Sequence, residues 1–368
     1  MLYFCIMTFR LLIIVSLIIS TSLSAQFDKG SNFGVEYRQK IGFLLPHRSV
    51  MKHLVQGHSH AGELTLMVQT SGQNEWENSY NLPRYGVTAY FSDFGFKDVL
   101  GQAGGAYLFS ELPFAKKNGW SFNNKLGFGL AYVSRIFDQT ENPKNNSVST
   151  HFNSLVVIGL QVNKQFNQNE LSLGVDMTHI SNGAAKMPNL GLNVPYLSFG
   201  YTRYFHTMNY QSSKNEELHP YLKMRKNWQL NLVGIGSSRQ VYPTGGANYL
   251  VSAIGVYTSK QIKRKVAFDL GFDFMLNQAH QARTEETASQ LDLLQVGVYG
   301  GYVLPINKLS FTLGFGAYIK NKFNLDGMIY NRFGCRYQFH DRWSINATIK
   351  AHWGRADYFE YGLIYRLF

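Results

Sequence analysis

Apolar and polar residues alternate with a period of two over most of this sequence, and this alternation limits the folds open to the chain. In residues 266–274 the even positions are large and apolar, and the odd positions are small or acidic; residues 309–315 and 228–232 repeat the pattern. Successive side chains of a β-strand point to opposite faces, so each such segment predicts a strand with one apolar and one polar face. This pattern is typical of a barrel with lipid outside and a polar interior, although a soluble β-sandwich produces it too.

The N-terminus and the composition favour the membrane barrel. Arg10 precedes a short apolar run, and small residues lead to Ala25, so we expect residues 1–25 to be a cleaved signal peptide. That run is shorter than the ~20 residues of a membrane-spanning helix. Aromatic residues make up 15% of the chain, with 34 glycines, only 9 prolines and a final strand ending in Phe368. Together these features predict an antiparallel transmembrane β-barrel of the bacterial outer membrane.

The formal net charge of +12 suggests an anionic partner, and an exported protein meets few kinds of anionic partner. We expect no nucleic acid partner, because an exported chain rarely meets one, and phosphorylated lipid headgroups are the expected anionic partner. The sequence contains no phosphate-binding glycine loop and no cysteine metal site, so we expect no cofactor and no metal. His53, His58 and His60 form a cluster that could bind a metal, but we interpret them as histidines at the barrel rim.

The segments with alternating character fall into two groups of about eight. Residues 26–206 and 228–368 each hold one group, and a polar stretch at 207–227 separates them. Two architectures fit: one barrel of about 14–16 strands, or a tandem of two eight-stranded barrels. We favour the single barrel, because one closed sheet leaves no strand edge in the bilayer. The second group contains His352-Trp-Gly354, a faint echo of the motif described next, which we treat as coincidence or a decayed copy.

Three polar residues share the apolar face of two neighbouring segments. In residues 171–181 the odd positions are Leu, Leu, Val, Met, His179 and Ser181, so this histidine and serine lie on the predicted lipid face. Asn193 has the apolar parity of the next segment, and antiparallel pairing brings it within reach of the histidine. If the mature N-terminus begins in the periplasm, this seventh strand runs outward. The three residues then lie at the level of outer-leaflet headgroups and acyl esters.

These residue types fit nucleophilic hydrolysis of an ester. A serine hydroxyl attacks only when an imidazole takes its proton, and a third group must hold that imidazole in one tautomer. We assign these roles to Ser181, His179 and Asn193, and we expect weaker activation than a carboxylate would give, because an amide carries no charge. Asn182 and the backbone N–H of Gly183 are candidates for the oxyanion hole.

The same segment resembles the motif of a known family. The motif runs His179-x-Ser181-Asn182 and continues, after six residues, as Asn189-x-Gly191-x-Asn193. It resembles that of the PagL family, outer-membrane lipid A 3-O-deacylases, whose triad is His, Ser and Glu. The resemblance covers about residues 30–206, implies an eight-stranded barrel there, and departs from the family at Asn193, which replaces the glutamate. Outer-membrane phospholipase A, a different barrel, has a Ser-His-Asn triad, so an amide is compatible with ester hydrolysis.

The leading hypothesis from the sequence is therefore an outer-membrane serine esterase that removes an ester-linked acyl chain from lipid A or another outer-leaflet lipid. One alternative is a phospholipase A-type hydrolase with the same machinery. Another is a non-catalytic porin or structural barrel. The acyl ester cleaved, the oligomeric state and the role of residues 207–368 stay open.

Overall fold

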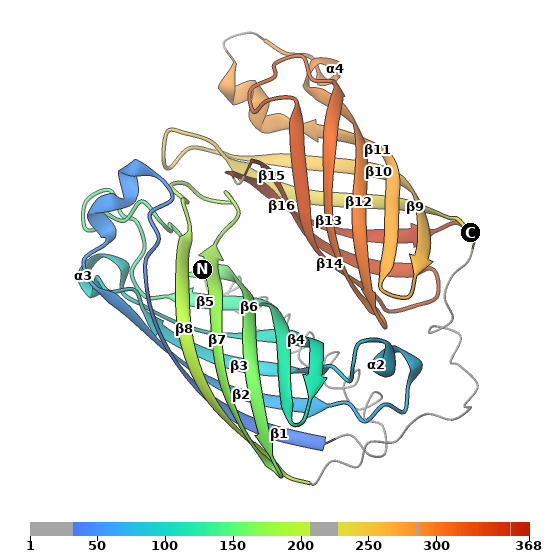
Figure 1. The fold of residues 1–368 in the computed structure, drawn as a ribbon. Helices are drawn as coiled ribbons and strands as arrows, with labels where there is room; N and C mark the ends of the chain where they lie inside the picture. The colour runs from blue at the N-terminus through green and yellow to red at the C-terminus, as the bar shows by residue number, and fades with distance from the viewer. Residues whose placement is uncertain (1–31, 207–226, 285–286, 354) are drawn as a thin grey trace, which may run out of the picture.

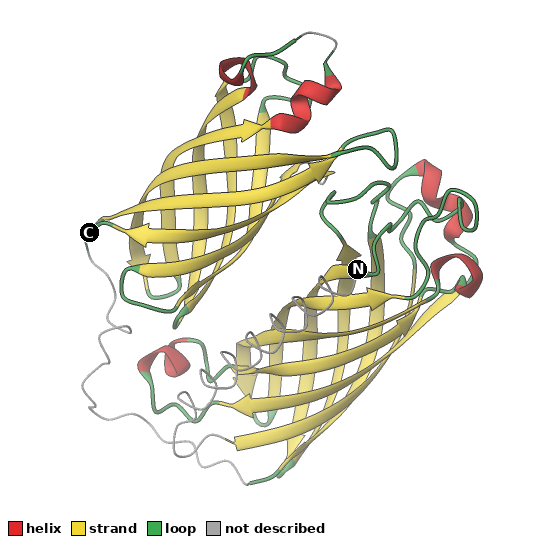
Figure 2. Cartoon of the chain, turned by 180° about the vertical axis from the view of Figure 1, so that it is seen from behind, coloured by secondary structure: helices red, strands yellow, loops and turns green. Residues whose placement is uncertain are grey.

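Two closed antiparallel β-barrels make up most of the molecule (Figures 1 and 2). The computed structural model describes residues 32–206, 227–284, 287–353 and 355–368. Strands β1 to β8 close the first barrel, here barrel 1, and β9 to β16 close the second, barrel 2.

The strands of both barrels are long and follow one another along the chain, joined by tight turns and by longer loops. Barrel 1 contains β1 (Asn32–Phe43), β2 (His58–Gln69), β3 (Arg84–Asp93), β4 (Gln102–Lys117), β5 (Trp120–Val133), β6 (Phe152–Phe166), β7 (Asn169–Ser181) and β8 (Leu192–Tyr204). Barrel 2 contains β9 (Gln229–Gln240), β10 (Asn248–Lys263), β11 (Val266–Asn277), β12 (Leu294–Ile306), β13 (Leu309–Lys320), β14 (Ile329–Gln338), β15 (Trp343–His352) and β16 (Arg355–Arg366).

Within the described ranges, helices occur only as short pieces between strands. They are η1 (Ser49–Leu54), α2 (Glu75–Ser79), α3 (Lys97–Leu100), η3 (Gln278–Arg283) and α4 (Gln290–Leu293). None of them is long and apolar enough to cross a membrane.

The predicted all-β barrel fold is confirmed, but the preference for a single barrel is wrong. Within the described residues there are sixteen strands; β1 pairs with β8, and β9 pairs with β16. Freedom from strand edges does not favour one large barrel over two small ones, because two closed eight-stranded sheets leave no edge either. The proposed signal peptide at 1–25, nearly all of the proposed linker at 207–227, and Gly354 lie outside the described residues.

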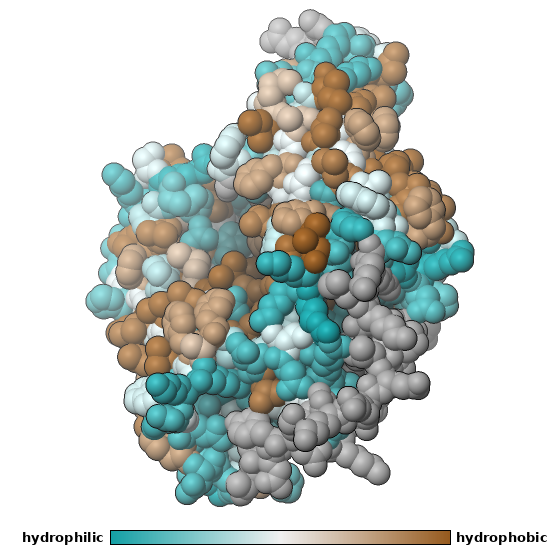
Figure 3. Space-filling model, turned by 45° about the vertical axis from the view of Figure 1, so that its right-hand side comes forward, coloured by the Kyte–Doolittle hydropathy of each residue, from teal (hydrophilic) through white to brown (hydrophobic). Residues whose placement is uncertain are grey.

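The alternation sorts side chains between the outer wall and the lumen of each barrel. In β7, Leu173 and Val175 point outward and are 57% and 55% exposed, whereas Glu170 and Ser172 are buried in the lumen. Figure 3 shows apolar side chains over the barrel walls and polar side chains over the loops at their ends. An apolar wall around a polar interior is the arrangement of a barrel that faces lipid.

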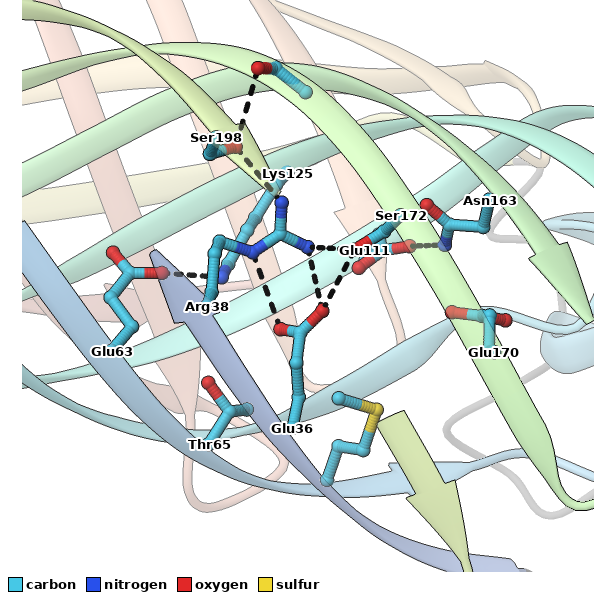
Figure 4. Close-up of polar contacts among 12 residues, drawn as sticks. Glu36, Arg38, Glu63, Thr65, Glu111, Lys125, Asn163, Glu170, Ser172 and Ser198 are labelled. Carbon is cyan, nitrogen blue, oxygen red and sulfur yellow. Dashed lines mark hydrogen bonds and ion pairs between the residues drawn. The ribbon is translucent and has the colours of Figure 1, made fainter. Parts of the chain in front are cut away.

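Paired charges fill the lumen of both barrels. In barrel 1, Arg38 lies 2.7 Å from Glu36 and donates to the hydroxyls of Ser172 and Ser198, each at 3.0 Å (Figure 4). In barrel 2, the buried Arg332 bonds Asp273 at 3.1 Å and Glu360 at 2.5 Å. Buried charges are tolerated when opposite charges and hydrogen bonds compensate them, so these networks serve as the polar cores of the barrels.

The two barrels contact each other near both of their ends. We call the end at which β7 finishes the site end, and the opposite end the turn end. At the turn end, the Tyr80 hydroxyl donates to the carbonyl of Pro305 at 2.5 Å, within an apolar cluster from both barrels. At the site end, the backbone N–H of Gln240, in β9, donates to the carbonyl of Ala184 at 3.1 Å. Barrel 2 therefore lies beside the loop that follows β7.

Candidate active site

The end of β7 and the start of β8 place three predicted site residues on the outer face of barrel 1. His179 and Asn193 are direct cross-strand partners in the register of these two strands, and Ser181 is the last residue of β7. Directly opposed residues of an antiparallel pair have Cβ atoms roughly 5 Å apart on the same face. The register thus brings the histidine and the asparagine into contact without help from any loop.

Two hydrogen bonds join the three side chains in series. His179 Nδ1 lies 2.5 Å from Asn193 Oδ1, and His179 Nε2 lies 2.9 Å from Ser181 Oγ. Since Oδ1 can only accept, Nδ1 carries the proton and Nε2 is the acceptor for the serine hydroxyl. This is the arrangement in which an imidazole can take the proton of a serine nucleophile.

Gly191 and Asn189 support the histidine and the loop beside it. Gly191 has φ +78°, and a Cβ at this position would lie 2.8 Å from His179 Cε1. Only glycine accommodates both that backbone conformation and such a close approach to the ring. The side-chain oxygen of Asn189 accepts from the backbone N–H of Asn182 at 3.2 Å, which draws the two ends of the loop together.

The two oxyanion-hole candidates have different surroundings. The side-chain N–H groups of Asn182 face the hydroxyls of Ser149 and Thr150, at 3.3 and 3.1 Å, and the carbonyl of Lys186 at 3.0 Å. Its donors therefore hold the neighbouring loops, contrary to the expectation that they stabilise an oxyanion. The backbone N–H of Gly183 donates to no group among the described residues. Gly183 is therefore the better candidate of the two.

The structure adds a residue that the sequence analysis missed. His47, in the segment after β1, lies with its Nδ1 2.9 Å from Asn193 Nδ2. The backbone N–H of Leu45 donates to the carbonyl of Asn193 at 2.8 Å and holds this segment against the start of β8. A signal for His47 existed in the sequence, because closure of an eight-stranded barrel places the end of β1 beside the start of β8.

Barrel 2 also contributes contacts to the site loop, residues 182–191. Besides its backbone bond to Ala184, Gln240 accepts the backbone N–H of Met187 through its side-chain oxygen at 2.6 Å. A Cβ at Gly183, which has φ +61°, would lie 2.2 Å from a ring carbon of Phe359 in β16. The loop beside the candidate nucleophile is therefore held between the two barrels.

The histidine cluster predicted at the rim does not converge on one point. The ring of His53 donates through Nε2 to the carbonyl of Lys144 at 2.8 Å. His58 and His60 are exposed at the start of β2, and both point outward. These positions match rim histidines and form no group of three metal ligands within the described residues.

One group with the spacing of metal ligands lies in barrel 2. Ligand atoms of Asp326, His352 and Asp357 all lie within 4.8 Å of one another. Asp357 is 2.7 Å from the ammonium of Lys350, and Asp326 is 2.9 Å from the guanidinium of Arg283. Both carboxylates already have a cationic partner, so an ion-pair cluster explains the group.

Comparison with known proteins places both halves of the chain in one family. Residues 60–202 match the family model "Lipid A 3-O-deacylase (PagL)", and residues 227–368 match "Acyloxyacyl hydrolase, C-terminal domain". The chain belongs to the PagL-like family. Each model corresponds to one barrel, so the likeness extends beyond the 30–206 region in which the motif occurs. Family and fold together support a location in the bacterial outer membrane.

Searches of curated sequences and solved structures add little to this assignment. No curated protein matches the chain. Among solved structures, Neisserial surface protein A is 11% identical, with a TM-score of 0.30, covering 48% of this chain and 97% of its own. Outer membrane protein Omp33 of Acinetobacter baumannii is 6% identical, with a TM-score of 0.19, covering 92% of this chain and 100% of its own. The β domain of the Bordetella autotransporter BrkA is 7% identical, with a TM-score of 0.26, covering 92% and 99%. TM-scores this low support no functional argument.

Proposed function

We propose that this protein is an outer-membrane serine esterase that removes an ester-linked acyl chain from lipid A. The observation that carries the proposal is the series of hydrogen bonds from Ser181 through His179 to Asn193 on the apolar outer face of barrel 1. Polar groups on a lipid-facing wall cost free energy, so three of them joined in this order call for a functional reason. The site also lies within the match to the deacylase model, residues 60–202.

Acylation begins at the serine hydroxyl. Ser181 Oγ attacks the carbonyl carbon of the acyl ester while His179 Nε2 takes its proton, and the carbonyl oxygen becomes the oxyanion. Asn193 holds the Nδ1–H of the imidazole and so keeps Nε2 free as the base. We assign the backbone N–H of Gly183 as one donor to the oxyanion.

Collapse of this intermediate breaks the ester bond. The alkoxy oxygen of the lipid leaves with the proton from His179, and the acyl group remains on Ser181. A water molecule then gives a proton to His179 and attacks the acyl carbonyl. The fatty acid leaves, and Ser181 recovers its proton, so the site returns to its starting state without any cofactor.

The surroundings of the triad fit a substrate that is itself part of the membrane. Below the triad, toward the middle of the wall, Val175 in β7 and Phe199 in β8 are both 55% exposed. The apolar wall can pack against an acyl chain while the ester lies at the strand end, beside Ser181. A lipid substrate can therefore approach this end of the wall without leaving the bilayer, while Ser181 itself is 2% exposed.

The charged lumens do not favour the rival hypothesis of a porin. Arg38 and Glu36 are buried in the interior of barrel 1, and Arg332, Asp273 and Glu360 are buried in that of barrel 2. An eight-stranded barrel has an interior just wide enough for side chains to fill, whereas channel-forming porins have about 16 strands.

The proposal is tested by mass spectrometry of lipid A and phospholipids from cells that express the full chain. Wild type should remove one ester-linked acyl chain from lipid A, and Ser181→Ala should leave lipid A intact. Ser238→Ala is the matched control, because Ser238 is an exposed serine on the outer wall of β9. Lipid A that is identical in all strains, including vector alone, would contradict the proposal. Lysophospholipid in place of deacylated lipid A would assign the same machinery to phospholipids.

A further inference from the structure

Asn193 poses a problem of orientation that a carboxylate would not. An amide has an oxygen on one side and an NH₂ group on the other, and a half-turn exchanges them. Only with Oδ1 toward His179 does the imidazole carry its proton on Nδ1 and present Nε2 as a base to Ser181. The reverse orientation places a donor against His179 Nδ1 and forces the opposite tautomer. Something must therefore fix the amide.

His47 is in the position to do so. Its Nδ1 lies 2.9 Å from Asn193 Nδ2, on the side of the amide opposite His179. Because Nδ2 can only donate, this contact is a hydrogen bond when His47 Nδ1 carries no proton. The backbone bond from Leu45 to Asn193 keeps the His47 segment on the start of β8.

We propose that His47 is a positioning residue that fixes the amide of Asn193 and, through it, the tautomer of His179. This inference rests on the proposed function. The neutral ring of His47 accepts from Nδ2, so Oδ1 accepts from His179 Nδ1–H, and His179 Nε2 is left to accept the proton of Ser181. The side chains of His47, Asn193, His179 and Ser181 then form one series of hydrogen bonds. Only this direction of donation leaves His179 able to act as the base.

Protonation of His47 reverses this series. A proton on His47 Nδ1 faces Nδ2 donor to donor, so the amide turns and presents Oδ1 to His47 instead. Nδ2 then donates to His179 Nδ1, which moves the proton of the neutral ring to Nε2 and removes the base. The charged and titratable groups facing His47 are Arg48 in its own segment and His179 on β7. Burial and, after it, Arg48 lower the pKa of His47, with partial opposition from a backbone hydrogen bond to Leu45, so the ring is neutral at neutral pH.

The test is a double-mutant cycle on the purified full chain, with fatty acid release from lipid A as the readout. We expect His47→Ala to lower kcat about tenfold with little change in KM, because a fraction of the amides then point the wrong way. In the Asn193→Glu background the same change should cost less than about twofold, because a carboxylate accepts whichever way it turns. His58→Ala, at an exposed rim histidine of the same barrel, is the matched control and should keep the wild-type rate.

A pH profile separates positioning from a purely structural role. In wild type both His47 and His179 must be neutral, so log kcat/KM should fall toward acid with a slope of about two. His47→Gln supplies a side-chain oxygen that accepts but does not titrate. It should keep the rate within about threefold and reduce the acid slope to about one.

The outcomes separate this inference from the proposed function. Equal losses for His47→Ala in both backgrounds, or no loss in either while Ser181→Ala is inactive, would overturn the role of His47 and leave the esterase in place. An unchanged acid slope in His47→Gln would also overturn it. Full activity in Ser181→Ala would overturn both. Heat-modifiability on gels verifies that each variant is folded, and His47→Gln tests the role even if His47→Ala does not fold.

Discussion

The seventh strand of each barrel has a histidine at or near its end, and the two histidines point in opposite directions. His179 in β7 lies on the outer face beside Ser181 and Asn193. His352 in β15 shares the parity of the buried Lys350 and points into the lumen, where its ring lies 3.2 Å from the Tyr318 hydroxyl. A shift of one residue in strand parity thus separates a histidine that can meet a lipid from one that belongs to a polar core. A similar sequence around the histidine is therefore not enough to form a second such site in barrel 2.

The largest expected effect on the rate of fatty acid release comes from replacing each of these two histidines in turn. His179→Ala should lower fatty acid release by about 10³-fold or more, because it removes the general base. His352→Ala should leave the rate within about twofold, since this side chain meets only lumen groups. Both variants are assayed with purified lipid A after a check of folding. Comparable losses for the two would contradict the division of roles between the barrels.

The next effect concerns stability and falls on barrel 2. Burial lowers the pKa of His280 in η3 to about 4, and the carboxylates of Asp357 and Asp326 oppose this only in part. In the unfolded chain His280 binds a proton near pH 6.5, whereas in the folded chain it binds one only near pH 4. The free energy of unfolding should therefore fall by about 3 kcal/mol as the pH drops through this window.

Thermal unfolding of barrel 2 between pH 7 and about pH 4 checks this prediction. His280→Gln should reduce the dependence by the contribution of His280, because the glutamine side chain does not titrate; the other titratable groups of the cluster keep theirs. His58→Gln, at an exposed rim histidine of barrel 1, is the control and should retain it. An unchanged dependence in His280→Gln would assign the acid sensitivity to other groups.

A smaller effect tests the chemistry of the third triad member. Asn193→Glu should raise kcat by up to about tenfold, because a carboxylate stabilises the imidazolium that an amide only orients. The rate of fatty acid release at saturating lipid A is the measurement. A fall in kcat in a folded variant would mean that the site is adapted to the amide, and that a carboxylate is not the stronger partner here.

The smallest effect tests whether barrel 2 holds the site loop of barrel 1. Gln240→Ala removes the side-chain bond to the backbone of Met187 and should lower kcat about threefold, because the loop carrying Gly183 is held less firmly. Ser238→Ala, two residues earlier on the exposed wall of β9, should change nothing. If both variants have the wild-type rate, barrel 2 does not help to order the loop.

Strand positions and faces could be predicted because they depend on local patterns. Each predicted strand follows from alternation, and the same parity places His179, Ser181 and Asn193 on one face, where the structure also has them. Their contact follows from an antiparallel pair with a short connection, which is again local. Barrel closure is different, because it depends on which distant strands pair.

His47 shows what is lost when closure is misjudged. In a single barrel of 14–16 strands β1 would pair with the last strand, far from Asn193. In the observed barrel β1 pairs with β8, and the residues after β1 reach the site. The contacts of Gln240 and Phe359 with the site loop depend on how the two barrels pack. The hydrogen bonds from the Asn182 side chain to Ser149 and Thr150 depend on loop geometry. Neither has a periodic signal in the sequence.

The central claim is that Ser181 hydrolyses lipid esters on the outer wall of barrel 1. It is tested most directly by fatty acid release from purified lipid A by the full chain in detergent, with Ser181→Ala and Ser238→Ala measured side by side. We predict that wild type and Ser238→Ala release fatty acid at equal rates, and that release by Ser181→Ala falls by about 10³-fold or more. Release by Ser181→Ala at the wild-type rate would contradict the account.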